Sequence, residues 1–156
     1  MADRRMNWIS PFFKKIVFTF PKYREMRYKS LGDWFFRGGV LFIASVREQG
    51  LESAIAVAIH ELVETILCNE AGVTQEQVDK FDMTHLFLDD PGLSPDAPYH
   101  RQHVAALKVE RAFCNAVGLS WKQHEKNMDI AEHCGSPDEN KPVPCKVKQN
   151  KRMKDM

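Results

Sequence analysis

Between Asp33 and Val46 the chain reads DWFFRGGVLFIASV. The residues on either side of Gly38 and Gly39 are mostly β-branched or aromatic, and such residues are typical of strands. Glycine supplies the positive φ angles that a tight turn between two strands requires. We therefore predict a β-hairpin here, and the segment KIVFTF at residues 15–20 predicts a further strand of the same small antiparallel sheet.

A long helix is predicted directly after the hairpin, over residues 52–70, with Gly72 as its C-cap. Apolar residues recur in this segment at the spacing of one helical face, so we expect that face to contact the core. These apolar residues are Ile55, Ile59, Leu62 and Ile66.

Three more helices are predicted from side chains that can cap their first turns. The capping side chains are Thr74 with Gln77, then Asp96, then Ser120 with Gln123. The helices that follow them are expected to begin after Thr74, to span residues 97–117, and to span residues 121–133. The expected fold class is therefore α+β, with a small antiparallel sheet or hairpin followed by three to four helices.

The length and composition favour one domain of ordinary size. The chain has 156 residues, of which 44% are hydrophobic and 28% charged, and these values exclude disorder throughout. We expect a single α+β domain over residues 1–134, with a partly extended basic end at 1–14 and a disordered basic tail at 135–156. No membrane span is expected, because no apolar run approaches about 18 residues, and no secretory signal is recognised, so we expect a cytoplasmic protein.

The charge is distributed unevenly along the chain. Residues 1–30 hold eight Lys and Arg against two acids, residues 31–135 hold eight against sixteen, and residues 136–156 hold six against three. The basic ends could bind an anionic partner such as nucleic acid, or they could simply keep the termini solvated.

Residues 58–64 read AIHELVE and carry the strongest chemical signal. On a helix, His60 and Glu64 lie one turn apart on the same face, where two side chains can converge on one metal ion. Glu61 is offset by about 100° around the axis, where its carboxylate could reach a metal-activated water. The alternative is a solvated polar face, but the surrounding residues are almost all apolar, and a buried charge must be paired or bind a metal.

A hydrophobic hairpin followed by a helix with this motif resembles the core of the zincin metallopeptidases, whose motif is His-Glu-x-x-His. The resemblance covers residues 34–68. It implies that His60 is a zinc ligand and Glu61 the catalytic general base, while Glu64 stands where the family has its second histidine. With the Pro-Tyr-His segment at residues 98–100, the pattern also resembles small bacterial and phage proteins, which implies no function.

A third ligand has to come from another part of the chain, and the segment YHRQH at residues 99–103 is the best source. His103 is preferred to His100, because it lies a full turn inside the predicted helix on a mostly apolar stripe. Together with His60 and Glu64 it would give two imidazoles and one carboxylate, a ligand set of catalytic zinc sites. Glu110 could instead accept a hydrogen bond from His103 as an outer partner, and both histidines could also lie in solvent.

Asp82 and His85 form another pair at helical spacing and could supply the third ligand in place of His103, although Asp79 and Asp82 could simply be solvated. The loop at residues 88–98 is rich in proline and is expected to act as a lid over the site. His124 and His133 are predicted to be surface residues.

These patterns leave three classes of function open. The first is a metal-dependent hydrolase, with Zn²⁺ as the expected metal and a peptide or other small molecule as substrate. The second is a nucleotide pyrophosphohydrolase in which Glu61, Glu64 and Asp82 bind Mg²⁺ through oxygen ligands. The third is a non-enzymatic phage or bacterial accessory protein whose polar cluster is structural.

Overall fold

The computed structural model describes residues 13–135 and confirms the expected α+β class. Residues 1–12 and 136–156 lie outside the described part of the chain. Residues 136–156 of the basic tail fall in them, whereas six of the eight lysines and arginines of residues 1–30 lie in the described part, and the anionic partner stays a prediction.

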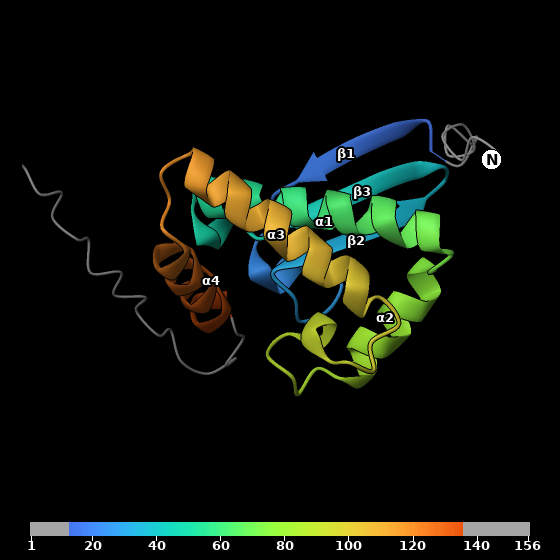
Figure 1. Ribbon diagram of the computed structural model, residues 1–156. Coiled ribbons are helices and arrows are strands. Elements are labelled where there is room, and N and C mark those ends of the chain that lie inside the picture. The colour runs from blue at the N-terminus through green and yellow to red at the C-terminus, as the bar shows by residue number, and fades with distance from the viewer. Residues whose placement is uncertain (1–12, 136–156) are drawn as a thin grey trace, which may run out of the picture.

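Three strands form one sheet, in the order β1-β3-β2 (Figure 1). They are β1 at Lys15–Thr19, β2 at Gly32–Arg37 and β3 at Val40–Ser45. The predicted hairpin is confirmed, because β2 and β3 pair antiparallel. Gly38 and Gly39, with φ angles of 57° and 75°, form its two-residue turn, whose twist matches that of the strands.

The expectation of an antiparallel sheet is wrong for β1, which pairs parallel to β3, so the sheet is mixed. The reason lies in residues 20–31, which connect β1 to β2. They include a 3₁₀ helix at Tyr23–Glu25 and carry the chain across to the far edge of β3, instead of turning back beside β1. Parallel pairing of two strands needs a connection that crosses the sheet. The residue pattern of the strands alone does not indicate to which edge of the sheet such a connection leads.

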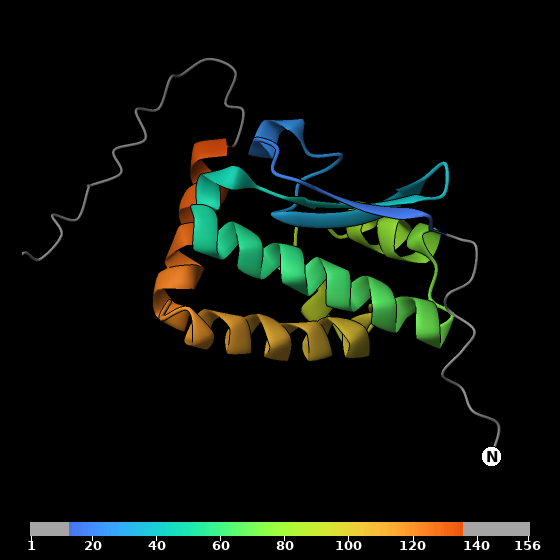
Figure 2. The same ribbon diagram turned by 90° about the horizontal axis from the view of Figure 1, so that it is seen from above.

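Helix α1, at Leu51–Ala71, is the middle layer of the molecule (Figure 2). The sheet covers one side of it and α3, at His100–Ala116, covers the other. The residues of α1 that these layers bury are mostly small or polar, such as Ala54, Ala56 and Ala58. Small side chains allow both neighbouring layers to approach the helix closely.

The apolar stripe predicted for α1 lies on the flank of this middle layer. Its four residues are half-buried, and only Leu62 among them packs against the main core cluster. The expectation that the whole stripe faces the core is wrong, because a helix between two layers is buried on two faces and not on one. The residues in question are Ile55, Ile59, Leu62 and Ile66.

The remaining helices are α2, at Gln75–Thr84, and α4, at Trp121–Gly135, which stands at one end of the layers. Two predicted caps are confirmed. Thr74 Oγ1 accepts a hydrogen bond from the N–H of Gln77 at 3.2 Å, and the Gln77 side chain accepts one from Thr74 N at 2.9 Å. Ser120 Oγ accepts from Gln123 N at 3.2 Å.

The predicted start of α3 at Ala97, capped by Asp96, is wrong. The helix begins at His100 with Tyr99 as its N-cap, because Pro98 disfavours helical backbone at the residue before it. Ahead of it, Pro91–Leu93 form a short 3₁₀ helix, η3, inside the loop that was expected to be a lid. Along residues 13–135, no helix is long and apolar enough to cross a bilayer.

Candidate metal centre

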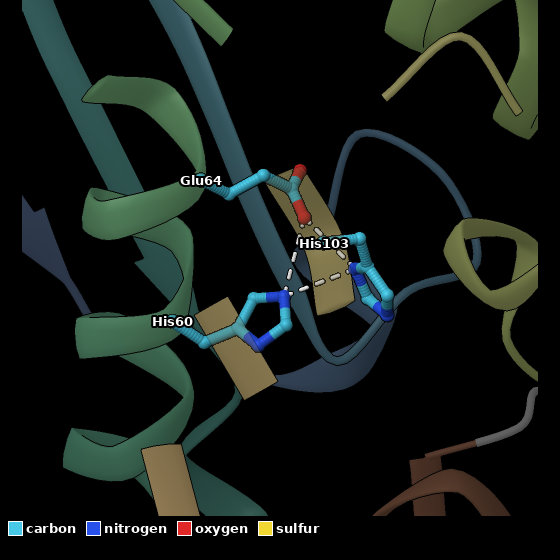
Figure 3. A group of neighbouring side chains, drawn as sticks. All are labelled: His60, Glu64 and His103. Carbon is cyan, nitrogen blue, oxygen red and sulfur yellow. Dashed lines mark hydrogen bonds and ion pairs between the residues drawn. The ribbon is translucent and has the colours of Figure 1, made fainter. Parts of the chain in front are cut away.

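Three side chains from α1 and α3 meet between the two helices (Figure 3). His60 Nε2 lies 3.2 Å from Glu64 Oε2 and 3.1 Å from His103 Nδ1, and His103 Nδ1 lies 2.8 Å from the same Glu64 oxygen. All three residues are buried. One helical turn of α1 thus supplies two of the converging atoms, and the crossing helix α3 supplies the third.

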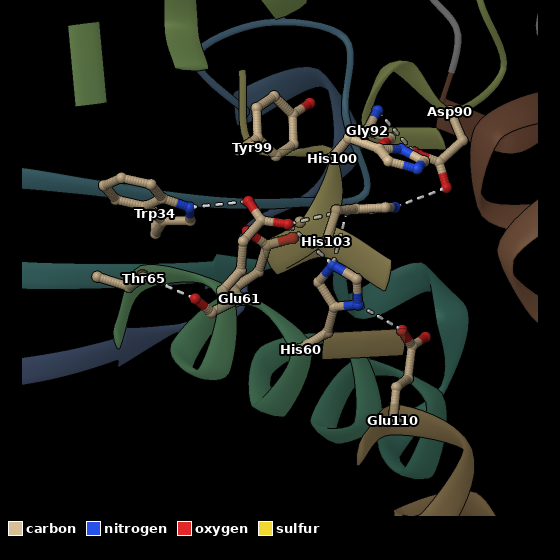
Figure 4. Close-up of polar contacts among 12 residues, drawn as sticks. Trp34, His60, Glu61, Thr65, Asp90, Gly92, Tyr99, His100, His103 and Glu110 are labelled. Carbon is tan, nitrogen blue, oxygen red and sulfur yellow. Dashed lines mark hydrogen bonds and ion pairs between the residues drawn. The ribbon is translucent and has the colours of Figure 1, made fainter. Parts of the chain in front are cut away.

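In each histidine the ring nitrogen that points into the trio is the inner nitrogen, and the other is the outer nitrogen. Each outer nitrogen contacts a further carboxylate. His60 Nδ1 lies 2.8 Å from Glu110 Oε2, and His103 Nε2 lies 3.0 Å from Asp90 Oδ2 (Figure 4). A carboxylate only accepts hydrogen bonds, so these outer nitrogens carry the hydrogens. In the neutral imidazoles the inner nitrogens therefore keep their lone pairs, and three electron-pair donors face one point.

Such an arrangement requires a cation, either a proton or a metal ion. Burial opposes ionisation of Glu64, but hydrogen bonds from His103 and His60 lower the pKa of its carboxyl to about 2. Burial likewise disfavours the charged form of His103, but its bonds to Asp90 and Glu64 raise its pKa to about 9. The 3.1 Å between the two inner nitrogens leaves room for one hydrogen, so they cannot both be protonated there.

The donor set fits zinc. Zinc binds imidazole nitrogen and carboxylate oxygen at about 2.0–2.2 Å, which places tetrahedral ligands about 3.3–3.5 Å apart. The separations of 2.8–3.2 Å between the three atoms are slightly shorter, so a small outward movement of the side chains would complete the geometry. Both histidines already have the outer carboxylate partner that is typical of zinc-binding histidines.

Glu61 lies beside this trio but is not part of it. Among residues 13–135, its carboxylate has no hydrogen-bond partner, and it is half-buried at the wall of a cleft. Gly32 packs directly against it, since a Cβ at Gly32 would lie 2.3 Å from Glu61 Oε1. Burial raises the pKa of Glu61 well above its usual range, and the negative charge of Glu64 raises it further.

The cleft has a volume of about 600 Å³, and His60, Glu61 and His103 are among the residues that line it. The start of β2, the 86–91 loop and one face of α4 form its walls. A smaller recess of about 70 Å³ adjoins β2 and the 86–91 loop and is lined by Glu61, Glu64 and His103 as well. A cleft of this size, with few convergent polar groups, is typical of a site for a small molecule or peptide segment.

The other candidate ligands lie apart from the trio. His100 Nδ1 bonds to the carbonyl of Gly92 at 3.0 Å, and His85 stacks on Phe81 with ring centroids 3.9 Å apart. Asp82 accepts hydrogen bonds from the hydroxyls of Tyr28 and Tyr99. Glu110 is an outer partner, but of His60 and not of His103, because the crossing of the helices brings its turn of α3 next to His60.

His124, predicted to be a surface residue, is fully buried, and that prediction is wrong. Its Nε2 lies 2.6 Å from Glu110 Oε1, so it holds the carboxylate that holds His60. Met128 and Ala131 follow it at helical spacing on the same face of α4, and this apolar stripe is the signal that could have indicated burial. His133 is exposed, as expected.

Sequence analysis also missed Asp90 and Trp34. Asp90 precedes η3 and bonds to His103, while Trp34 Nε1 donates to Glu64 Oε1 at 3.0 Å and fixes the second oxygen of that carboxylate. Nothing in the local sequence of either residue indicates these contacts, which depend on how distant segments pack.

Comparison with known proteins identifies no relative of this chain. No protein-family model, no curated protein and no solved structure matches the chain. The functional assignment therefore depends on the contacts described above and on the motif at residues 58–64.

Proposed function

We propose that this protein is a zinc-dependent hydrolase that cleaves a peptide or other amide bond. The observation that carries the proposal is the convergence of His60 Nε2, Glu64 Oε2 and His103 Nδ1 on one point, with both outer imidazole nitrogens engaged by carboxylates. The carboxylate of Glu61, which lines the cleft beside this point and has no hydrogen-bond partner among residues 13–135, supports a hydrolytic role.

The ligand set favours zinc over magnesium. Two imidazoles and one carboxylate suit Zn²⁺, whereas Mg²⁺ prefers an octahedron of oxygens. The pyrophosphohydrolase alternative needs Asp82 as a ligand, but Asp82 is occupied by two tyrosine hydroxyls. It is therefore the weaker candidate for this site.

In the proposed reaction, zinc would be held by His60, Glu64 and His103 and would lower the pKa of a bound water. Glu61 would accept the proton of that water and pass it to the leaving nitrogen. A raised pKa suits this task, because a general base works best when its pKa lies near the working pH.

The hairpin is linked to the candidate metal centre through β2, an edge strand of the sheet, because Trp34 Nε1 donates to Glu64 Oε1 at 3.0 Å. Gly32, Asp33 and Trp34 are buried, so a substrate would reach the trio through the cleft and not by pairing with these residues of β2.

The test is elemental analysis of the purified full chain before and after dialysis against a chelator. It is combined with hydrolysis of a panel of quenched-fluorescent peptides. We expect one zinc per chain, loss of metal in His60→Ala, and retention of metal without hydrolysis in Glu61→Gln. Glu70→Gln, at the exposed end of α1, is the matched control and should keep both properties.

One observation favours the non-enzymatic alternative and gives the test its opposite outcome. Within residues 13–135 each ring nitrogen of the trio has a carboxylate oxygen within 3.2 Å, so a single proton held between the inner nitrogens and Glu64 would be enough to neutralise the cluster without a metal. If the protein neither contains nor binds zinc, the cluster is a structural network of an accessory protein. Hydrolysis that requires magnesium, or loss of metal in Glu61→Gln, would instead support the oxygen-ligand alternative.

A further inference from the structure

The walls of the 600 Å³ cleft carry an excess of negative charge outside the candidate metal centre. Glu125, Asp129 and Glu132 lie at helical spacing on the face of α4 that lines the cleft, and Asp89 lines it from the 86–91 loop. The basic side chains of the lining are Lys29 and His133, apart from the two histidines of the trio.

Little of this charge is compensated by the neighbouring side chains. His133 forms an exposed pair with Asp129 at 3.3 Å, and Glu125 accepts a hydrogen bond from Trp121 Nε1 at 2.7 Å. Asp89 and Glu132 have no hydrogen bond or ion pair within residues 13–135. Burial, followed by the charges of Asp89 and Asp129, raises the pKa of Glu132 against the effect of Lys29.

The position of the acids relative to the reacting groups gives this charge a function. The acidic walls enclose the same space that reaches His60, Glu61 and His103, so a ligand in the cleft would contact both. A cleft that is lined by charges of one sign and has low-dielectric walls concentrates ligands of the opposite charge. An anionic ligand such as a nucleotide would be repelled from this space.

We infer that the substrate is a polypeptide segment carrying lysine or arginine side chains, which the walls formed by α4 and the 86–91 loop bind beside the candidate metal centre. The inference rests on the proposed function, and it adds the substrate class. A polypeptide is preferred to a small amine because the proposed reaction cleaves a peptide or other amide bond, and a cleft of about 600 Å³ is large enough to hold a peptide segment.

The test measures binding separately from hydrolysis. Three labelled peptides of equal length, with lysines, serines or glutamates at the same positions, are titrated with the zinc-loaded Glu61→Gln chain and followed by fluorescence anisotropy. We expect the lysine peptide to bind most tightly, and its affinity to fall between about 0.05 M and about 0.5 M salt, because salt screens exposed charges.

A matched pair of double variants locates the charge effect. Asp129→Asn with Glu132→Gln should weaken lysine-peptide binding about three- to tenfold, as expected for two partly exposed charges. Glu70→Gln with Glu76→Gln removes the same charge from exposed positions outside the cleft and should have no effect. Circular dichroism establishes that both double variants are folded.

The outcomes separate this inference from the proposed function. Equal binding of the three peptides, or equal binding by the two double variants, overturns the inference. Competition by spermine as effective as competition by the lysine peptide overturns the polypeptide part of it. Charge-selective binding without any hydrolysis by the unmodified zinc-loaded chain overturns the proposed function alone, and equal hydrolysis of all three peptides overturns the substrate class alone.

Discussion

The two histidines of the trio are held in very different surroundings. Behind His60 lie Glu110 and then His124, whose side chains are 4% and 0% exposed. Behind His103 lies Asp90, which is 38% exposed and belongs to the loop before η3. The half of the site around His60 is thus buried, whereas the half around His103 is more exposed and can exchange its outer hydrogen bond with water.

This difference indicates a division of roles. The buried half fixes the orientation of the His60 ring, because the two oxygens of Glu110 contact His60 Nδ1 and His124 Nε2. The more exposed half belongs to a segment that ligands can reach, and side chains there can adjust when a ligand enters. The following predictions test this contrast.

The largest effect is expected when the ligands themselves are removed. His60→Ala should abolish zinc binding and destabilise the metal-free protein by about 3–5 kcal/mol, because it removes one partner from each of two buried carboxylates, Glu64 and Glu110. His103→Ala should also abolish zinc binding but cost only about 1–3 kcal/mol, since water can reach Asp90. Zinc titration and urea unfolding measure both quantities. Equal destabilisation by the two substitutions would contradict the division of roles.

Substitution of Glu110, the outer carboxylate of His60, should weaken zinc binding more than substitution of Asp90, the outer carboxylate of His103. Glu110→Gln is expected to weaken zinc binding about 10–100-fold, because an amide can donate to His60 Nδ1 and so place the hydrogen on the inner nitrogen. Asp90→Asn should weaken it less than about tenfold, because water can replace the lost acceptor. Competition titrations against a chromophoric chelator give both values. An effect of Asp90→Asn larger than that of Glu110→Gln would reverse the proposed order.

Two glycines allow the metal and the base to be perturbed separately. A Cβ at Gly92 would lie 2.4 Å from the ring of His103, so Gly92→Ala should displace this ligand and weaken zinc binding. A Cβ at Gly32 would lie 2.3 Å from Glu61 Oε1, so Gly32→Ala should lower hydrolysis with little change in zinc affinity. Zinc titration and peptide hydrolysis are measured on both variants. If Gly32→Ala lost zinc as Gly92→Ala does, Glu61 would belong to the ligand set.

The smallest effect concerns Asp82, outside the trio. Burial raises its pKa from 3.8 to about 6, even though the hydrogen bonds from Tyr99 and Tyr28 lower it. A raised pKa in the folded state means that this carboxyl stabilises the fold below about pH 4, and that the contribution is lost as the pH rises through about 6. Asp82→Asn should therefore gain stability relative to the unmodified protein between about pH 5 and about pH 7.5, measured by urea unfolding. Asp96→Asn, on the exposed loop, is the control.

What could be predicted from the sequence is what depends on neighbours along the chain. The turn at Gly38 and Gly39, the cap at Thr74 and the one-turn spacing of His60 and Glu64 all follow from local geometry. The α+β class follows from the order of these local elements.

The rest depends on packing between distant segments. The parallel placement of β1, the contact of Glu110 with His60 and the burial of His124 are set by how the connection at residues 20–31 and the helices cross. Hydrophobic spacing also failed to give the orientation of α1, because that helix is enclosed from two sides.

The small side chains between α1 and α3 also determine how far apart the ligands lie. Ala56 is one turn before His60, and Ala106 lies between His103 and Glu110 on the facing helix; both are completely buried. A larger residue at either position would push the two helices apart, and the nitrogens of His60 and His103 would move apart with them. The two alanines therefore act as a spacer for the metal centre: they set its size without contributing a ligand, and substitutions that enlarge them should favour a larger cation over zinc.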